Sequence, residues 1–325
     1  MKDSFDREID YMRISLTDRC NLRCLYCMDE KGIFKLNHED ILTFEEIINV
    51  ICIASKLGIK KVRYTGGEPL IRCDLVKLIS MTKEIKGIEE ICLTTNGILL
   101  KKYASDLKKA GLDRINISID TLKDDKYKFI TRLGNINDVL TGIDEALKVF
   151  KKVKLNVVLI GGFNRDEILD FIKLTFDKNI DVRFIELMPM IKNDYFTNAS
   201  YINCNEVLNV LKNANIKYSC IVSDNNYLNN SVAKLYHVDG AVGNFGLISE
   251  IYASTCANCN RIRLTADGKL KPCLHSDYEI NIKGLESSEI EEKLKLAILS
   301  KPQKHKDLII DKISLNNRTM NEIGG

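Results

Sequence analysis

The sequence lacks the long apolar run that a membrane-spanning helix requires. Its 325 residues contain no stretch of about 18 consecutive apolar residues, the length that marks a transmembrane candidate. They also contain no apolar signal segment at the N-terminus, no low-complexity tract and no strong internal repeat. The net charge is only +3, so composition gives no reason to expect binding to nucleic acid. We therefore expect a protein that binds neither membranes nor nucleic acid.

Histidine is scarce, whereas cysteine is plentiful. The chain has four histidines and eleven cysteines, and none of the histidines is an evident general acid or base. Eleven cysteines without a signal segment argue against a secreted scaffold held by disulfides. Six of them form two groups, which indicates metal binding in a reducing compartment, and we expect a cytoplasmic protein. The other five are expected to pack as small buried apolar residues: Cys52, Cys73, Cys92, Cys204 and Cys220.

The first cysteine group is Cys20, Cys24 and Cys27, at C-x3-C-x2-C spacing with Tyr26 before the last cysteine. Three thiolates on one short loop are suited to an iron–sulfur cluster. A [4Fe–4S] cluster has four irons, so three cysteines leave one iron free for chemistry, as in catalytic metal sites. The alternatives are a zinc site or three unrelated buried cysteines. Zinc usually takes four protein ligands, and no fourth is nearby, so the pattern favours the cluster.

Strand-like and helix-like segments alternate along the first part of the chain. We predict strands over 11–16, 61–65, 91–95, 114–119, 153–160 and 182–187, and helices over 44–57, 74–85, 137–151 and 165–176. Six such units with mostly apolar strands indicate an α/β fold with a parallel sheet covered by helices. The regular pattern ends near residue 189. We therefore expect two regions, 1–189 and 190–325, the second with a short helix over 203–212.

Several residues at strand ends are candidates for ligand binding, because barrel enzymes place their sites there. The turn 66–69 has the sequence Gly-Gly-Glu-Pro. Two glycines let the backbone approach a ligand closely, and Glu68 could accept a hydrogen bond from an ammonium group. Such a tetrapeptide is also a common turn. Ser118 and Met188 end two other predicted strands, although a methionine in that position is more often core packing.

Four cations lie on different predicted strands and point toward one end of the sheet: Arg13, Arg63, Lys154 and Arg183. A lone arginine or lysine on a strand is usually solvated or part of a salt bridge. Converging arginine and lysine groups are what a polyphosphate needs, through charge-assisted hydrogen bonds. The pattern therefore indicates a nucleoside triphosphate.

The second cysteine group is Cys256, Cys259 and Cys273, at C-x2-C-x13-C spacing. Zinc is a stronger alternative here, because C-x2-C is the usual zinc half-site and His275 could serve as a fourth ligand. In a chain that already has one three-cysteine loop, a second [4Fe–4S] cluster with an open iron is the favoured interpretation.

Several of these features together resemble one known family. The loop 20–27 resembles the cluster loop of radical S-adenosylmethionine (SAM) enzymes. With the second cysteine motif, the Arg261-x-Arg263 that follows its C-x2-C and the terminal Gly324-Gly325, it resembles the molybdenum cofactor biosynthesis protein A family, the GTP 3′,8-cyclases. The resemblance covers nearly the whole chain. It implies an incomplete (β/α)6 TIM-like barrel of the radical SAM type over 1–189, and a smaller C-terminal region, 190–325, with a second Fe–S cluster and a Gly-Gly tail.

The resemblance also implies a reaction, that of a radical SAM lyase. The first cluster binds and cleaves SAM, giving methionine and a 5′-deoxyadenosyl radical. The radical removes hydrogen from C3′ of GTP, and the C3′ radical then attacks C8 of the guanine. An electron and a proton then complete the product, (8S)-3′,8-cyclo-7,8-dihydroguanosine 5′-triphosphate. The second cluster holds the guanine through its open iron.

Site residues follow from the same resemblance. It assigns SAM binding to Tyr26, Gly67, Ser118 and Met188; GTP binding to Arg13, Arg63, Thr94, Lys154, Arg183, Arg261 and Arg263; and a catalytic role in the tail to Gly324 and Gly325. We expect the tail to enter the barrel and help to orient GTP.

The resemblance further implies partners. These are GTP, a reductant such as flavodoxin or ferredoxin, cyclic pyranopterin monophosphate synthase downstream, and a second copy of the chain in a homodimer. Three alternatives remain open: a peptide-modifying radical SAM enzyme with an auxiliary cluster, a non-catalytic Fe–S or zinc-binding module, and a related cyclase acting on another nucleotide.

Overall fold

The computed structural model describes residues 1–32, 36–189, 195–196, 198–221, 233–249, 256–305 and 318–324. Six parallel strands form its centre: β1 (Tyr11–Ser15), β2 (Lys61–Thr65), β3 (Glu90–Thr95), β4 (Arg114–Ser118), β5 (Val153–Leu159) and β6 (Ile180–Glu186). They are neighbours in chain order, each hydrogen-bonded to the next. All six are strands that the sequence predicts, with end points that differ by at most two residues.

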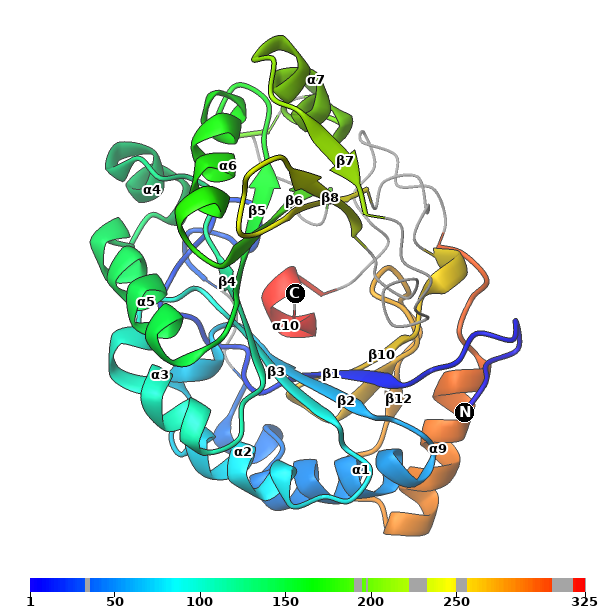
Figure 1. Cartoon of the computed structure of the whole chain (residues 1–325). Coiled ribbons are helices and arrows are strands. Elements are labelled where there is room, and N and C mark those ends of the chain that lie inside the picture. The colour runs from blue at the N-terminus through cyan, green and yellow to red at the C-terminus, as the bar shows by residue number, and fades with distance from the viewer. Residues whose placement is uncertain are drawn as a thin grey trace.

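Strands from the C-terminal half extend this sheet at both edges (Figure 1). They are β7 (Tyr218–Cys220), β8 (Lys234–Val238), β9 (Phe245–Ile248), β10 (Arg261–Leu264), β11 (Lys269–Lys271) and β12 (Ile280–Asn281). Strand β9 pairs in parallel with β6, and β10 pairs in parallel with β1. The division between 1–189 and 190–325 stays a prediction, because strands from both ranges share one sheet.

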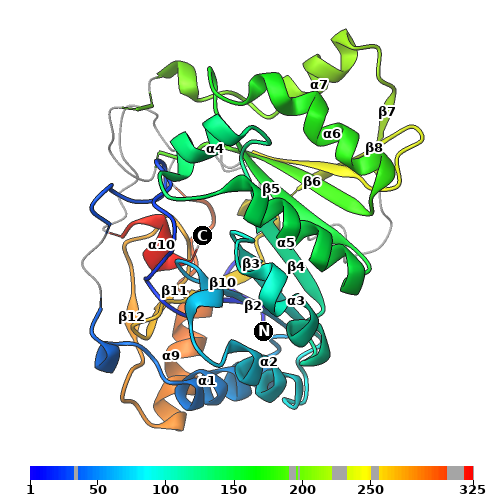
Figure 2. The same ribbon diagram turned by 90° about the vertical axis from the view of Figure 1, so that its left-hand side faces the viewer.

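Helices cover the outer face of the curved sheet (Figures 1 and 2). They are α1 (Phe44–Lys56), α2 (Leu75–Lys83), α3 (Leu100–Lys109), α4 (Asp124–Thr131), α5 (Ile136–Val149), α6 (Ile168–Asp177), α7 (Asn205–Asn213) and α9 (Ser287–Leu299). Helix α1 begins with a capping box, in which the Thr43 side chain accepts from the Glu46 amide and the Glu46 side chain accepts from the Thr43 amide. Helix α9 packs beside α1, where Ser287 Oγ lies 3.2 Å from Asn49 Oδ1.

The concave side of the sheet faces a lumen. The short helix α10 (Met320–Ile323) lies in that lumen, near the centre of the barrel in Figure 1. Burial alternates along β5, so that Val153 and Leu155 are buried in the core whereas Lys154 and Asn156 are half-buried and line the lumen. The incomplete (β/α)6 barrel is therefore confirmed, and its interior is lined by polar side chains.

Among the described residues, no helix is both long and apolar enough to cross a membrane. The prediction that the five scattered cysteines are buried holds for Cys92 and Cys204, but Cys52 is only partly buried, and Cys73 and Cys220 are exposed. It is wrong for these last two because Cys73 lies on a surface turn and Cys220 on the short outer strand β7.

Candidate active site

One large cavity fills the barrel lumen, with a volume of about 930 Å³. Fourteen of the nineteen residues expected to bind or react line its wall. They are Cys20, Cys24 and Cys27; Tyr26, Gly67, Ser118 and Met188; and Arg13, Arg63, Thr94, Lys154, Arg183, Arg261 and Arg263. The second cysteine group lies beside the cavity, since its neighbours Asn260, Arg261 and Leu274 line it. Gly325 lies outside the described residues.

The first cysteine loop is held against helix α4. The amides of Arg23 and Leu25 donate to the carbonyls of Thr131 and Ile130, at 3.0 and 2.9 Å. Arg132 Nη1 donates to the Arg23 carbonyl at 2.9 Å. These long-range bonds fix the backbone of the loop, so its three sulfurs have defined positions at the cavity wall.

The thiols of this loop suit a metal cluster chemically. None of the eleven cysteines forms a disulfide. Burial raises the pKa of Cys20 to about 11 and that of Cys27 to about 12. Buried thiols that are costly to ionise alone are stabilised as thiolates by bound metal, which displaces their protons. Three such side chains at one cavity wall fit the expected [4Fe–4S] cluster with one open iron.

The Gly-Gly-Glu-Pro turn packs directly on the chain that leads into this loop. The amides of Gly67 and Glu68 donate to the carbonyls of Thr17 and Arg19 at 2.7 and 2.8 Å. A Cβ on Gly67 would lie 2.1 Å from the Arg19 carbonyl oxygen, so glycine is required there by contact with protein backbone.

Glu68 is occupied by protein donors. Its carboxylate accepts hydrogen bonds from Thr95 Oγ1, the Asn96 amide and the Leu70 amide, at 2.7, 2.8 and 3.0 Å. Burial raises the pKa of Glu68 to about 7. Its structural role here is to tie the turn to the end of β3, while an ammonium contact stays a prediction.

Tyr26 and Ser118 lie near a buried carboxylate that the sequence did not indicate. Tyr26 donates its hydroxyl to Asp120 Oδ2 at 2.6 Å, and the Val158 amide donates to Asp120 Oδ1 at 2.8 Å. Burial raises the pKa of Asp120 to about 6. The contact orients the Tyr26 ring between the cysteine loop and the ends of β4 and β5.

Three arginines form a row across neighbouring strands. Arg13 is in register with Arg263 on one side and with Arg63 on the other, so the three side chains lie on the same face of the sheet. Burial, followed by the charge of Arg263, lowers the pKa of Arg13 well below its usual value. Arg63 donates to Thr94 Oγ1 at 3.2 Å. The three side chains belong to residues within the strands and line the lumen, because the alternation of side chains along each strand turns them inward.

Arg183 and Lys154 add to this positive lining. The Nε of Arg183 is buried and has no hydrogen-bond partner among the described residues. Burial and the charge of Arg183 lower the pKa of Lys154 to about 6. Buried and half-buried cations in such number are costly unless an anion joins them, and a triphosphate would supply several anionic oxygens.

The second cysteine group has a more positive environment. Burial raises the pKa of Cys259, but the charges of Arg261 and Lys301 outweigh it and bring the pKa to about 6. Lys301 is buried, and its Nζ donates to the carbonyls of Arg261 and Pro272, both at 2.9 Å. It thereby joins the C-x2-C turn to the loop that carries Cys273, the arrangement needed for three thiolates on one cluster.

Two residues near this group were missed by sequence reasoning. Arg7 donates to the Cys256 carbonyl at 2.8 Å from the far end of the chain. The His305 side chain hydrogen-bonds to Cys256, which contributes to a lowered pKa against the effect of burial. His275, the candidate zinc ligand, packs against His305 with ring centroids 4.6 Å apart. Nothing in the local sequence around Arg7 or His305 indicated these contacts.

The geometry bears on the zinc alternatives. Within the parts of the chain that the structure describes, no group of three or more His, Cys, Asp or Glu side chains is arranged to hold a metal ion. A four-iron cluster presents a separate iron to each thiolate, so its ligands need not converge on one point. Three thiols in each group match the donor set of a [4Fe–4S] cluster with one open iron.

The C-terminal tail enters the lumen as expected. The Gly324 carbonyl accepts a hydrogen bond from Arg263 Nη1 at 2.6 Å. Its φ is +78°, and a Cβ there would lie 2.2 Å from Thr65 Oγ1, so only glycine fits. Asn321 is buried and donates from Nδ2 to the Asp18 carbonyl at 3.0 Å.

Comparisons with known proteins agree with this geometry. Residues 14–175 match the Radical SAM superfamily, and residues 180–307 match the family described as Molybdenum Cofactor Synthesis C. A protein of Alkaliphilus oremlandii named GTP 3′,8-cyclase is 50% identical over the full length of both chains. A protein of the same name from Petrotoga mobilis is 45% identical, again over both full chains.

Solved structures with a similar fold are more distant in sequence. Streptococcus suis SuiB bound to S-adenosylmethionine superimposes with a TM-score of 0.63 at 15% identity, covering 91% of this chain and 67% of that one. A second, anSMEcpe with bound AdoMet, has a TM-score of 0.60 at 14% identity, covering 92% and 79%. The chain belongs to the radical SAM superfamily and, within it, to the GTP 3′,8-cyclase family.

Proposed function

We propose that this protein is a GTP 3′,8-cyclase of molybdenum cofactor biosynthesis, a radical SAM lyase that uses two [4Fe–4S] clusters and SAM. It converts GTP to (8S)-3′,8-cyclo-7,8-dihydroguanosine 5′-triphosphate. The observation that carries the proposal is the row Arg263–Arg13–Arg63 in the same cavity as the C-x3-C-x2-C loop. Relatives with that name match the chain over its full length.

The SAM end of the cavity is formed by the first cysteine loop. Cys20, Cys24 and Cys27 would hold the first cluster, which, when bound, supplies the electron that cleaves SAM to methionine and a 5′-deoxyadenosyl radical. Tyr26 and Ser118 line the part of the cavity that would receive the adenosyl group of SAM, and both carry a hydroxyl group. The hydrogen bond from Tyr26 to Asp120 fixes the position of the tyrosine ring. The shared position of Tyr26 and Ser118 at the cavity wall supports the SAM-binding roles given to them, to Gly67 and to Met188.

The GTP end is formed by the cations. Arg13, Arg63, Lys154 and Arg183 line one cavity, and each can give charge-assisted hydrogen bonds to phosphate oxygens. Binding the triphosphate there would hold the ribose toward the SAM end. Positioning of this kind is the main contribution of the protein, since a misplacement of about 1 Å can cost roughly a hundredfold in rate.

The guanine end is formed by the second cysteine group. Cys256, Cys259 and Cys273 would hold the second cluster, which would supply an open iron for binding of the base. Arg261 and Arg263 continue from this group along β10 into the cavity. The lowered pKa of Cys259, despite its burial, supports a site that holds thiolates.

The setting of the enzyme follows from the same role. We infer a cytoplasmic location, flavodoxin or ferredoxin as reductant, and cyclic pyranopterin monophosphate synthase as the next enzyme. We also infer a homodimer, and a division of the chain into a barrel core (1–189) and a cluster-bearing C-terminal region (190–325).

A direct assay tests the proposed function. The reconstituted protein would be incubated anaerobically with SAM, dithionite and GTP, and the products analysed by mass. A cyclised triphosphate is expected. Modification of a peptide, or turnover of another nucleotide in place of GTP, would favour one of the two enzymatic alternatives, and no SAM cleavage at all would favour a non-catalytic module.

Lys154 provides a prediction with a defined pH dependence. Its pKa is about 6 in the free protein, and a nearby triphosphate would raise it, so binding of GTP takes up a proton above pH 6. The dissociation constant of GTP should therefore rise between about pH 6 and 8. Lys154→Met should weaken GTP binding about 10- to 100-fold, as for one charge-assisted contact, and remove that pH dependence.

Guanosine is the control ligand for this measurement. It lacks phosphates, so its binding should change little in Lys154→Met and in Arg183→Ala. Equal losses for GTP and guanosine would place these residues outside the phosphate site.

Lys154 also affects the stability of the fold. Because its folded-state pKa lies below its unfolded value, folding is penalised at pH 7, and the penalty disappears as pH rises toward 10.5. Lys154→Met should thus raise the unfolding temperature at pH 7, by about 2–4 °C for each kcal/mol recovered.

A further inference from the structure

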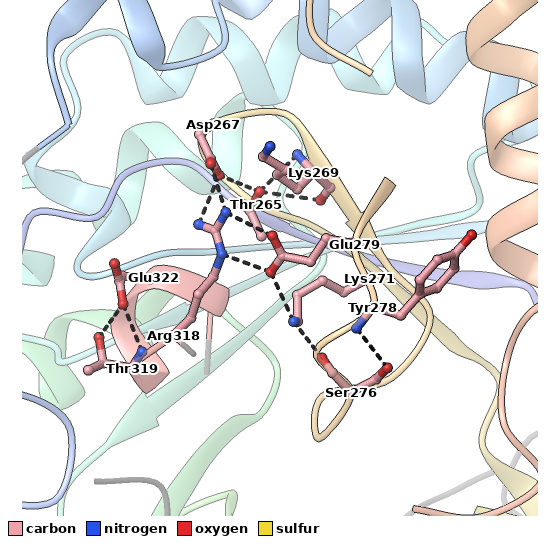
Figure 3. Close-up of polar contacts among 10 residues, drawn as sticks. All are labelled: Thr265, Asp267, Lys269, Lys271, Ser276, Tyr278, Glu279, Arg318, Thr319 and Glu322. Atoms are coloured by element: carbon pink, nitrogen blue, oxygen red, sulfur yellow. Dashed lines mark hydrogen bonds and ion pairs between the residues drawn. The ribbon is translucent and has the colours of Figure 1, made fainter. Parts of the chain in front are cut away.

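The residue that begins the final described segment of the chain, Arg318, is bound on two sides by carboxylates (Figure 3). Its Nη1 and Nη2 contact Asp267 Oδ1 and Oδ2 at 3.1 and 2.8 Å. Its Nε and Nη2 contact Glu279 Oε1 and Oε2 at 2.8 and 2.9 Å. Both contacts are bidentate, the geometry in which arginine binds carboxylates most strongly.

The two carboxylates come from the strands beside the second cysteine group. Asp267 lies in the turn between β10 and β11, and Glu279 immediately precedes β12. The side chain of Lys271 is fully buried, and its Nζ contacts Glu279 Oε1 at 3.0 Å and the Ser276 carbonyl at 2.7 Å. Cys273 lies between Lys271 and Glu279 in the sequence, so the ion pair of these two residues closes the frame of that cysteine loop, and Asp267 is joined to this frame through Arg318.

The exposure of these side chains separates them from ordinary surface ion pairs. Arg318, Asp267 and Glu279 are only 17%, 15% and 19% exposed. The two carboxylates, Asp267 and Glu279, balance the charges of the two cations, Arg318 and Lys271. Each of these poorly exposed charges is neutralised only while its partners are present. Removing Arg318 would leave two carboxylates beside one lysine.

The segment after Arg318 reaches the first cysteine group. Helix α10 begins with a capping box between Thr319 and Glu322, and the backbone N–H of Asn321 hydrogen-bonds to the sulfur of Cys27. The Asn321 side chain donates to the Asp18 carbonyl. Seven residues thus connect the frame of the second cysteine group, at Arg318, with a cysteine of the first group and with Arg263 at Gly324.

We infer that Arg318, Asp267 and Glu279 form a clamp that positions the C-terminal tail in the active site, so that hydrogen abstraction is coupled to cyclisation. Arg318 is a positioning residue, since it acts through α10 and Gly324. The inference rests on the proposed function, because the coupling concerns the cyclised product. The location of the tail itself is measured independently of that product.

The experiment compares Arg318→Ala, Arg318→Lys and a matched control in the full-length, reconstituted protein. Arg165→Ala is the control, because it removes an arginine from the exposed pair with Glu206, away from the cavity. Hydrogen exchange of residues 319–323 reports the position of the tail. Cyclised product per 5′-deoxyadenosine formed reports coupling, and iron content and unfolding temperature report folding.

The clamp predicts faster exchange at 319–323 in Arg318→Ala and roughly a hundredfold less product per SAM cleaved, with unchanged iron. Arg318→Lys should be intermediate, since one ammonium group cannot make two bidentate contacts, and Arg165→Ala should match the wild type. If Arg318→Ala does not fold, Asp267→Asn, which keeps the contact with Glu279, should show a smaller change in the same direction.

Wild-type exchange and wild-type coupling in Arg318→Ala would overturn the clamp. A wild-type protein that cleaves SAM but forms no cyclised product would overturn the proposed function instead, and hydrogen exchange would still decide whether Arg318 holds the tail.

Discussion

Deleting Gly324 and Gly325 should abolish the cyclised product and leave the fold, the iron content and unproductive SAM cleavage in place. The reason is geometric, because Gly324 accepts a hydrogen bond from Arg263 inside the lumen. Without the two glycines, Arg263 loses this hydrogen bond, and the tail no longer helps to hold Arg263 and the bound GTP in position. A loss of roughly a hundredfold or more is expected, as for a reacting atom moved by about 1 Å. The measurement is product and 5′-deoxyadenosine quantified in the same anaerobic reaction.

Gly324→Ala is the matched variant for this deletion. An added Cβ would lie 2.2 Å from Thr65 Oγ1 at a φ of +78°, so the tail must move although its length is kept. The substitution should reproduce most of the effect of the deletion. A truncated protein with the full rate of product formation would show that the tail has no part in positioning GTP.

Replacing Cys256, Cys259 and Cys273 together by serine should halve the iron content. We expect about eight irons per chain in the wild type, from two four-iron clusters, and about four in the variant. Serine oxygen is a harder ligand than thiolate and does not hold such a cluster. SAM cleavage should persist in part, because the first cysteine loop is untouched, but no cyclised product should form.

Cys220→Ser is the control for this triple variant, since Cys220 is exposed and belongs to neither group. It should keep all of the iron. Zinc in the second site of anaerobically purified wild-type protein would contradict the two-cluster interpretation.

Much of the fold could be predicted because its signals are local. The six barrel strands follow apolar runs between turn residues, and the start of α1 follows from Thr43 and Glu46 alone. The two cysteine motifs are equally local. Helix α9 was missed although its capping box, Glu286 with Glu289, is present in the sequence, because an acidic N-cap before a highly charged helix is a weak signal.

What could not be predicted depends on contacts between distant parts of the chain. Arg318 meets Asp267 across 51 positions of sequence, and Arg7 meets the Cys256 carbonyl across 249. Single charged residues in surface-like sequence give no sign of such partners. The row Arg263–Arg13–Arg63 also depends on strand register, which decides which side chains meet in the lumen and which is set by pairing between strands that are far apart in the sequence.

The central claim is that this active site removes a hydrogen atom from C3′ of GTP. The most direct measurement uses GTP deuterated at C3′, with SAM and dithionite under anaerobic conditions, and the mass of the 5′-deoxyadenosine formed. The account predicts that this 5′-deoxyadenosine carries deuterium and that a cyclised triphosphate accumulates with it. 5′-Deoxyadenosine that carries no deuterium, in the presence of bound GTP, would contradict it.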